Sequence, residues 1–359
     1  MSLSSGRTFL LLVTVLLLSL AIVTFLPARA LAQSYCGPAT AINFNSSNGS
    51  YPYAGVTFDS LGNMYGTTSN GGASGFGNVW KYTSSAGLTQ LFNFTGSSSP
   101  SNNGDRPMTP LLADQQGNLY GATYYGGNNF SGEGTGWGTL FKLSSGGQFT
   151  ELYQFSGPDG ANPIGAVLLD SQGNLWGTTY QGGNGFNGLG NDGYGTIFTY
   201  SGGTVTNPVL FNISNGENTN GGMATDGTNY YGTTYQGGAN GFGTLFQYNS
   251  TTGQLTTLFN FNRNPNGSFP IGAVTYDGKG NLYGTTSEGG GHSGPSNACC
   301  GTVWRYSLSS GTLTTLVSFD GDTVPADGIY PEGGVTLDSN GNLYGTTGQG
   351  GTFSDGIVY

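Results

Sequence analysis

Apolar residues gather along this chain in short segments that polar, glycine-rich stretches separate. In the part of the chain around residues 110–165, four such segments follow one another: Pro110–Ala113, Leu119–Thr123, Gly138–Leu143 and Gln148–Phe155. Aromatic and β-branched residues are frequent in them, which is typical of β-strands. The pattern therefore predicts four strands in this part of the chain.

Two of the connections between these strands are tight turns. The sequence D-Q-Q-G-N at residues 114–118 joins the first strand to the second, because an aspartate can accept the N–H groups of a turn and a glycine tolerates positive φ. Ser144–Gly147 joins the third strand to the fourth. The other connections are long: a Gly- and Asn-rich loop extends to Gly136, and Gly157–Gly165 leads into the next unit.

The same pattern occurs six times along the chain. The block G-N-L-Y-G-T-T, or a close variant, recurs with its asparagines 55, 56, 55, 52 and 61 residues apart. These asparagines are Asn63, Asn118, Asn174, Asn229, Asn281 and Asn342. Four antiparallel strands in about 55 residues are typical of one propeller blade. We therefore predict an all-β, six-bladed β-propeller of four-stranded antiparallel blades. A β-solenoid is the alternative, but it would need shorter coils and parallel pairing, whereas the tight turns favour hairpins.

Both ends of the repeat region fit a closed ring. Thr40–Phe44 resembles the fourth strand of a blade, as in Leu313–Phe319, and Gly356–Tyr359 resembles the start of a third strand. We predict that Ala41–Asn45 lies antiparallel beside Ile357–Tyr359. This N-terminal strand would complete the last blade, close the ring and remove two open sheet edges.

Composition excludes several classes of protein. The chain has 68 glycines in 359 residues, and glycine costs about 0.5–1 kcal/mol in a helix interior, so a mainly helical protein is excluded. Its 22 Tyr, 21 Phe and 4 Trp exclude a disordered chain. The formal charge is −10, and eight basic residues without a cluster exclude a nucleic-acid partner and disfavour an anionic membrane surface.

The N-terminus has the features of an export signal. Arg7 precedes the apolar segment Phe9–Leu26, and the small residues Ala30 and Ala32 place a cleavage site before Gln33. An uncleaved anchor helix is the alternative, since 18 residues can span a bilayer.

We expect residues 1–32 to be a signal peptide and residues 33–359 to form a single propeller domain without membrane insertion. The protein would then be secreted or held at the cell surface. Removal of Arg7 and Arg29 with the signal takes the formal charge from −10 to −12.

The repeats resemble the GloVer tandem repeats of exported bacterial proteins described as "choice-of-anchor" proteins. Over roughly residues 40–359, three features carry the resemblance: the D-x-x-G-N-L-Y-G-T-T block, a Gly-Gly loop such as Gly71-Gly72, and the strand G-T-[VLI]-[FW]-x-[YL]. The resemblance implies an extracytoplasmic, β-propeller-like repeat protein. It implies no reaction, because the family has no agreed catalytic residues.

The long connections fall at one end of each antiparallel blade, so one face of the ring carries the long loops. Binding residues concentrate on such loops, and we expect any ligand there. Aromatic residues before the third strand or after the second are candidate contacts for sugar rings; they are Phe76, Trp137, Tyr194, Phe242, Tyr125, Tyr180 and Tyr235. The alternative is that these rings fill the wedge between adjacent blades, which their repeated positions favour. The Tyr or Trp of the G-N-L-Y block is expected in the core.

Three acidic residues lie in the long loops between the second and third strands: Glu133, Asp192 and Glu288. A glycosidase would need two carboxylates about 5–10 Å apart, whereas scattered loop carboxylates need no function. The six repeated aspartates are expected to cap their turns rather than to form a site. They are Asp59, Asp114, Asp170, Asp226, Asp277 and Asp338.

Few residues remain for metal or covalent chemistry. The single histidine, His292, has no ligand partner at a recognised spacing, and we expect neither a zinc centre nor a bound cofactor. The calcium candidates, whose spacing differs from an EF-hand, are Asp320, Asp322 and Asp327. The three cysteines, whose pairing the spacing leaves open, are Cys36, Cys299 and Cys300.

We therefore expect a non-catalytic binding or structural module that contacts glycans or other envelope components. Two alternatives remain: a glycan-active hydrolase or lyase that uses loop carboxylates, and a cell-surface scaffold without a ligand. A true site would gather unmatched residues from neighbouring blades at one mouth. Even spacing around the ring would favour the scaffold.

Overall fold

The computed structural model describes residues 42–96, 103–127, 136–188, 192–291, 300–320 and 328–359. The chain divides into two compact units, Met1–Asn43 and Phe44–Tyr359. The second unit contains all the strands, and the account below concerns that unit. Among the described residues, no helix is long and apolar enough to cross a membrane.

The second unit consists of β-sheets, one per repeat. The first two sheets contain β1 (Thr57–Phe58), β2 (Met64–Thr68), β3 (Asn78–Thr83), β4 (Gly87–Asn93), β5 (Leu112–Ala113), β6 (Leu119–Thr123), β7 (Thr139–Leu143) and β8 (Phe149–Gln154). The next two contain β9 (Leu168–Leu169), β10 (Leu175–Thr179), β11 (Thr196–Ser201), β12 (Thr204–Leu210), β13 (Ala224–Thr225), β14 (Asn229–Thr234), β15 (Thr244–Asn249) and β16 (Gln254–Asn260). The last two contain β17 (Thr275–Tyr276), β18 (Asn281–Thr286), β19 (Thr302–Ser307), β20 (Thr312–Ser318), β21 (Thr336–Leu337) and β22 (Leu343–Tyr344).

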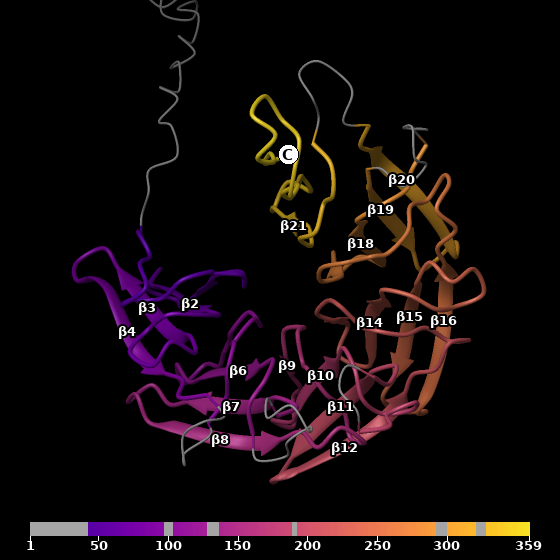
Figure 1. Ribbon diagram of the computed structural model, residues 1–359. Coiled ribbons are helices and arrows are strands. Elements are labelled where there is room, and N and C mark those ends of the chain that lie inside the picture. The colour runs from indigo at the N-terminus through magenta and orange to yellow at the C-terminus, as the bar shows by residue number, and fades with distance from the viewer. Residues whose placement is uncertain (1–41, 97–102, 128–135, 189–191, 292–299, 321–327) are drawn as a thin grey trace, which may run out of the picture. The chain divides into compact units, whose positions relative to one another are not determined.

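Five of these sheets have four strands in sequence order, and every ladder is antiparallel. Figure 1 shows the sheets following one another around a ring. The predicted six-bladed, all-β propeller is therefore confirmed. The predicted strands of the second repeat differ from β5–β8 by at most two residues at either end.

The sixth sheet has two strands, β21 and β22. Beyond β22, Thr346 bridges Val358, and Gly345 and Tyr359 exchange two backbone hydrogen bonds of 2.9 and 3.1 Å. The C-terminal residues thus lie where the third strand of a blade belongs, as expected. The predicted pairing of Ala41–Asn45 with this segment begins outside the described residues, and it stays a prediction.

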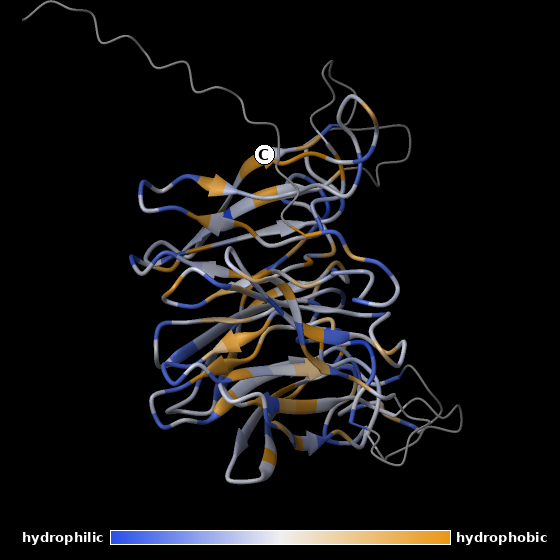
Figure 2. Cartoon of the chain, turned by 90° about the vertical axis from the view of Figure 1, so that its left-hand side faces the viewer, coloured by the Kyte–Doolittle hydropathy of each residue, from blue (hydrophilic) through white to orange (hydrophobic). Residues whose placement is uncertain are grey.

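The core lies between neighbouring sheets. Each apolar cluster joins two consecutive sheets; in the third cluster, Tyr231 and Leu245 of the fourth sheet pack with Leu282 and Trp304 of the fifth. Figure 2 shows the apolar positions concentrated on the strands and the hydrophilic ones in the turns. Burial of apolar surface therefore stabilises contacts between repeats as much as each repeat by itself.

One aromatic contact recurs between consecutive repeats. The Phe that ends or follows each fourth strand meets a ring on the third strand of the next repeat, with ring centroids 5.1–5.8 Å apart. The pairs are Phe44–Trp80, Phe94–Phe141, Phe155–Phe198, Phe211–Phe246, Phe261–Trp304 and Phe319–Tyr359. Phe44 therefore holds the position of a fourth-strand Phe relative to the first repeat, as the sequence predicted.

The repeated aspartate organises each tight turn. In the third repeat, Asp170 Oδ1 accepts the backbone N–H groups of Gln172 and Asn174, and Oδ2 accepts the Asn174 side chain at 2.9 Å and Trp176 Nε1 at 3.0 Å. The backbone and asparagine bonds recur in all six turns. The predicted capping role is confirmed.

The aromatic residue of the G-N-L-Y block is less buried than expected. Trp176 and Tyr231 are buried, but the equivalent Tyr344 is 48% exposed, and the others are half-buried. In five of the six repeats its polar atom donates to the turn aspartate. A ring of the next repeat lies against Trp176 and Tyr231, with centroids 4.4 and 6.1 Å apart, whereas Tyr344 has no such ring contact among the described residues. The expectation that this residue lies in the core was wrong at Tyr344.

Candidate functional site

The two kinds of long loop meet on one face, as the sequence predicted. In every repeat the connector from the preceding blade forms an antiparallel bridge with the residue that lies just beyond the second strand. The bridges are Ser50–Asn70, Asp105–Tyr125, Ala161–Gln181, Glu217–Gln236, Ser268–Glu288 and Ile329–Gln349. We call this the long-loop face. The loops are thereby tied to a common framework, which can present side chains in fixed positions.

Six equivalent residues, one from each repeat, have positive φ on this face although none is a glycine. They occupy the third position of the G-x-x-P connector or its equivalent, with φ between 54° and 60°. They are Tyr51, Arg106, Asn162, Asn218, Phe269 and Tyr330. Asparagine accepts this conformation readily, whereas for a bulky side chain it is an unusual and strained one.

Backbone hydrogen bonds hold this conformation in place. In the second repeat, Arg106 N–H donates to Phe76 O at 3.2 Å, and Arg106 O accepts Tyr124 N–H at 3.0 Å. The carbonyl bond recurs in all six repeats, and five repeats show the N–H bond. The framework therefore imposes positive φ on whatever residue occupies the position.

The side chain at this position makes different contacts in different repeats. Asn162 and Asn218 each donate their amide to a backbone carbonyl of the preceding repeat, at Tyr124 and Tyr180, at 2.9 Å. Tyr51 and Arg106 make no such bond and are exposed. Phe269 and Tyr330 also carry the strain without this hydrogen bond, but they are half-buried, so Tyr51 and Arg106 are the exposed pair. Strain of this kind is frequent at ligand sites.

A pocket opens between these two residues. Its volume is about 300 Å³, and its lining comes from the first two repeats: Tyr51, Tyr53, Ser69, Asn70, Arg106 and Met108. Tyr51 is 65% exposed and Tyr53 is 71% exposed. We call it the tyrosine–arginine pocket. None of the other repeats combines these residue types at these positions.

Tyrosines continue from this pocket along the long-loop face. The guanidinium of Arg106 lies 5.2 Å from the ring centre of Tyr125, whose ring meets that of Tyr124 edge-on at 4.7 Å. Burial, followed by the neighbouring phenols of Tyr125 and Tyr180, raises the pKa of Tyr124 to about 12. Burial, Tyr235 and Glu217 likewise raise the pKa of Tyr180. The phenols of three successive repeats are thus close enough to influence one another, and we call them the tyrosine row.

The ring also encloses a central cavity of about 600 Å³, which residues of all six repeats line. Its wall is mostly small residues and backbone, because consecutive inner strands approach closely: a Cβ on Gly221 would lie 1.9 Å from Gly272 O. The residue directly after the connector differs between repeats and adds a longer side chain to this wall. It is Tyr53, Met108, Ile164, Asn220 and Glu332 in the five repeats where it reaches the cavity.

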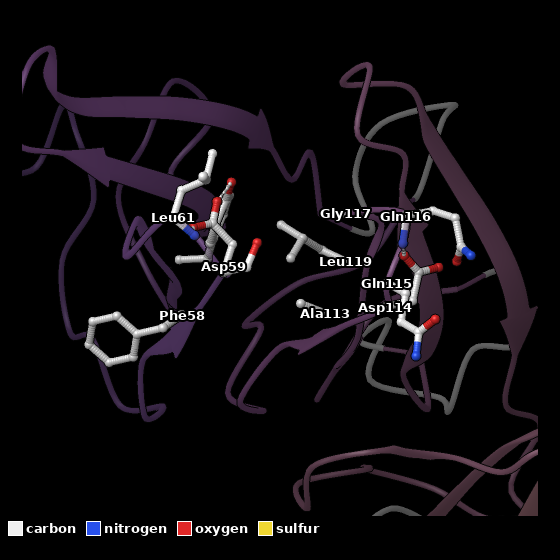
Figure 3. A pocket seen from close by; sticks show the side chains of 11 residues that line it. Phe58, Asp59, Leu61, Ala113, Asp114, Gln115, Gln116, Gly117 and Leu119 are labelled. Atoms are coloured by element: carbon white, nitrogen blue, oxygen red, sulfur yellow. Dashed lines mark hydrogen bonds between the residues drawn. The ribbon is translucent and has the colours of Figure 1, made fainter.

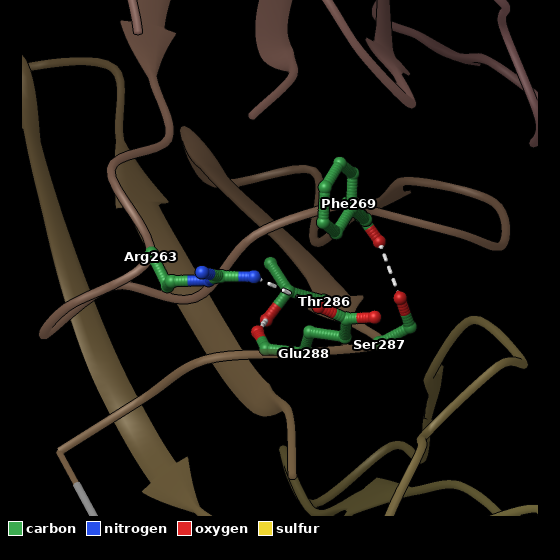
Figure 4. A network of polar contacts seen from close by, with 5 residues as sticks. All are labelled: Arg263, Phe269, Thr286, Ser287 and Glu288. Carbon is green, nitrogen blue, oxygen red and sulfur yellow. Dashed lines mark hydrogen bonds and ion pairs between the residues drawn. The ribbon is translucent and has the colours of Figure 1, made fainter. Parts of the chain in front are cut away.

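The fifth repeat contains the single ion pair among the described residues. Arg263 Nη2 lies 3.5 Å from Glu288 Oε2, and the guanidinium is 5.3 Å from the centre of the Phe242 ring (Figure 4). Ser287 donates to Phe269 O at 3.0 Å in the same network. Glu288 is therefore engaged with a neighbouring arginine.

The four aromatic candidates before the third strand are packed. Trp137 is 6% exposed and meets Phe186 edge-on at 5.0 Å, while the other three are half-buried against the core clusters. Each backbone carbonyl accepts the N–H of a positive-φ residue, as Cys300 does in the fifth repeat. The three tyrosine candidates after the second strand, Tyr125, Tyr180 and Tyr235, are half-buried and belong to the row described above.

Of the three acidic candidates, the two that the structure describes each have a partner of their own. Glu133 lies outside the described residues. Asp192 Oδ2 accepts the backbone N–H of Asn187 at 2.7 Å, and Glu288 pairs with Arg263. The described residues contain no group of three or more His, Cys, Asp or Glu that could hold a metal ion. The calls that fall outside the described residues are His292, Cys36, Cys299, Asp322 and Asp327.

A second large cavity lies between the tight turns of the first two repeats. It has a volume of about 590 Å³, and Figure 3 shows Asp59 and Leu61 on one side and Asp114 and Gln116 on the other. Its two carboxylates already accept the turn hydrogen bonds. Hydrogen bonds from Asn63 lower the pKa of Asp59 to about 2, so this carboxylate is a poor proton donor.

Sequence reasoning missed the tyrosine–arginine pocket. The repeated aromatic residues were predicted as candidate sugar contacts, although they recur because of their packing. The informative signal was variation at otherwise repeated positions: the position of Tyr51 and Arg106 holds Asn, Phe or Tyr in the other repeats, and the position of Tyr53 holds Met, Ile, Asn or Glu.

Comparison with known proteins supports the repeat assignment. A family model described as Gloeobacter/Verrucomicrobia repeat matches residues 33–189 and 131–359. No curated protein matches this sequence.

Solved structures of propeller type match the fold at low identity. A GH74 enzyme from Niastella koreensis is 18% identical with a TM-score of 0.53, over 84% of this chain and 42% of that one. This chain thus spans less than half of that enzyme. A gluconolactonase from Xanthomonas campestris is 13% identical with a TM-score of 0.47, over 85% of this chain and 84% of that one. At these identities the likeness shows the fold alone.

Proposed function

The chain belongs to the Gloeobacter/Verrucomicrobia repeat family, and on that premise we propose that it is an exported, non-catalytic module that binds glycans on its long-loop face. The observation that carries the proposal is the tyrosine–arginine pocket. In it, residues that the other repeats lack come together from two neighbouring blades, whereas a scaffold without a ligand would show similar residues in every repeat.

The chemistry of the pocket suits a sugar. Tyr51 and Tyr53 present exposed rings whose flat faces can stack on the apolar face of a pyranose, and their hydroxyls stay available for hydrogen bonds. A volume of about 300 Å³ is at the lower end for small-ligand sites and fits one or two sugar rings. Tyr51 O accepts the backbone N–H groups of Tyr53 and Ser69, and these bonds hold the turn that carries both rings, so little ordering is needed on binding.

The acidic groups of this face support binding rather than hydrolysis. Glycoside hydrolysis needs one carboxyl group as acid and a second as base or nucleophile. Two described carboxylates of the loops between the second and third strands have structural partners instead: Glu288 pairs with Arg263, and Asp192 accepts a backbone N–H.

A glycan array probed with the purified full chain tests this function. Tyr53→Ala should weaken binding at least ~10-fold, a change of about 1.4 kcal/mol, because a stacking ring is removed. Tyr51→Asn should do the same while keeping a residue that tolerates positive φ. Phe58→Ala is the matched control, because Phe58 is an exposed aromatic residue at the tight-turn end.

Two results would contradict the proposal. A blank array from folded protein would leave the scaffold as the better account. Release of reducing ends from a bound polysaccharide, lost in Glu288→Gln, would establish a hydrolase instead.

A further inference from the structure

We infer that the tyrosine–arginine pocket selects sugars that carry a carboxylate, such as uronic acid residues, through the guanidinium of Arg106. This inference rests on the proposed glycan-binding function and names the class of sugar. It is carried by three observations on the described residues: the charge of Arg106 has no paired carboxylate, its backbone is strained, and its side chain borders a pocket that exposed tyrosines line.

Arg106 differs from the other basic residues that the structure describes. Arg263 pairs with Glu288, and Lys279 lies in the tight turn of Asp277, at the end of its blade away from the long loops. Lys81 and Lys142 lie on third strands, 5.2 and 5.4 Å from the ring centres of the turn-bonded tyrosines of the adjacent second strands. Arg305 lies on β19 and contributes to none of the cavities described above. Only Arg106 among these six lines a pocket of the long-loop face.

The charge matters because the protein as a whole is acidic, with a formal charge of −10. Such a surface repels anions in general, so an anionic ligand needs a specific local cation. Within the described part of the chain, Arg106 forms no ion pair. Burial raises the pKa of the neighbouring Asp105 and the charge of Arg106 partly opposes this rise, but the two side chains form no ion pair.

Arg106 holds a backbone conformation that is strained for a bulky side chain, as Tyr51, Phe269 and Tyr330 also do at the equivalent position. Asparagine occupies the equivalent position in the third and fourth repeats, where it accepts positive φ and stitches two repeats together. Arginine does not accept positive φ readily, and the side chain of Arg106 makes no such hydrogen bond between repeats. Its long side chain instead places a positive charge at the edge of the tyrosine–arginine pocket.

The surroundings prepare the guanidinium for a planar anion. The ring of Tyr125, 5.2 Å from the guanidinium, orients it without neutralising its charge. Arginine offers parallel N–H donors that match the two oxygens of a carboxylate. Asn70 lines the same pocket; its Oδ1 accepts the Ser69 hydroxyl, and its amide nitrogen has no hydrogen-bond partner among the described residues. That amide can therefore donate a hydrogen bond to a sugar hydroxyl while Tyr51 and Tyr53 stack on the sugar ring.

Calorimetric titration with matched oligosaccharides tests the inference. Fragments of galacturonan, glucuronan and alginate are each compared with the carboxyl-reduced, neutral form of the same fragment. We expect at least one acidic fragment to bind ~10-fold more tightly than its reduced form. We also expect this ratio to shrink as NaCl is raised, because salt screens an exposed ion pair.

Arg106→Asn should bring the ratio to about one. This variant copies the residue that the fold already accepts at Asn162 and Asn218, so loss of folding does not confuse the result. Arg305→Gln is the control: it removes one positive charge from an exposed position on β19 and should leave the ratio unchanged.

A ratio near one in the unaltered protein, or a ratio that persists in Arg106→Asn, would overturn the inference. Neutral glycans that bind with sensitivity to Tyr53→Ala would then leave the proposed function standing. Tighter binding of sulfated galactan than of every uronate would overturn the carboxylate assignment. Failure of all these glycans to bind folded protein would overturn the proposed function together with this inference.

Discussion

A single aspartate performs several tasks in each tight turn. Asp170 accepts two backbone N–H groups, one amide and the indole N–H of Trp176, all at 2.8–3.0 Å. Burial by itself would raise the pKa of this carboxyl group, but these hydrogen bonds outweigh it and lower the pKa. The residue therefore couples the turn to the aromatic ring of the second strand.

Asp170→Ala should lower the free energy of unfolding by about 1–2 kcal/mol, comparable to the loss of a helix cap, because the N–H groups of the turn lose their acceptor. Urea denaturation measures the effect. Ser171→Ala changes an exposed residue of the same turn and should leave the midpoint unchanged. Equal midpoints for Asp170→Ala and the unaltered protein would contradict the capping role.

At the scale of the strand, a glycine in the repeated block makes room for an aromatic ring. A Cβ on Gly177 of β10 would lie 2.4 Å from Phe198 of β11, and the equivalent glycines of all six repeats meet a third-strand ring at 2.3–2.6 Å. Those same rings form the contacts between repeats. The glycine is therefore required by packing, since its φ is not positive.

Gly177→Ala should destabilise the protein by about 1–3 kcal/mol, because the fully buried Phe198 has to move. Chemical denaturation is again the measurement. Gly55→Ala is the matched control, since a Cβ there meets nothing within 4 Å and its φ is not positive. Combining Gly177→Ala with Phe198→Leu should recover part of the loss; a double variant that is simply the sum of both losses would argue against the steric explanation.

At the scale of the whole molecule, the six turns give the ring a common response to acid. All six turn aspartates have a lowered pKa, which for Asp59 is about 2 against an ordinary 3.8. Between these values the unfolded chain binds more protons than the folded one, so stability falls as pH falls. Burial raises the pKa of Asp105, Glu151 and Glu217, and these groups act in the opposite sense.

Because the turn aspartates outnumber these groups, the urea midpoint should change little between pH 7 and pH 5 and fall between pH 4 and pH 3. Denaturation series at these pH values, followed by tryptophan fluorescence, measure the effect. A midpoint that stays constant or rises down to pH 3 would show that the turn hydrogen bonds do not control acid stability.

The ring arrangement also explains the difference between the two faces. Tight turns leave little backbone for variation at one end, whereas connectors and long loops meet at the other. Each connector is pinned by backbone bonds, so side chains there can change without loss of the fold. The first two repeats use this freedom for the tyrosine–arginine pocket, and the third and fourth use it to stitch neighbouring repeats together with asparagine.

The architecture was predictable from the sequence because local patterns encode it. The D-x-x-G-N turn, the alternation of four short strands and the sixfold period depend on contacts within one repeat, and Phe44 could be recognised as a fourth-strand residue from the same pattern. The aromatic residues before the third strand were harder to interpret. Their role includes a backbone carbonyl that accepts the N–H of the next repeat, and no side-chain pattern reports such a bond.

The sequence by itself determined the fold class, the number of repeats, the capping aspartates and the face on which long loops gather, because each follows from residues close together in the chain. Only the tertiary structure decided which variable residues share a pocket. Tyr51 and Arg106 are 55 residues apart in sequence, and they line one cavity because curvature of the ring brings successive connectors side by side. That curvature arises from the packing of whole sheets against each other, which no single repeat contains.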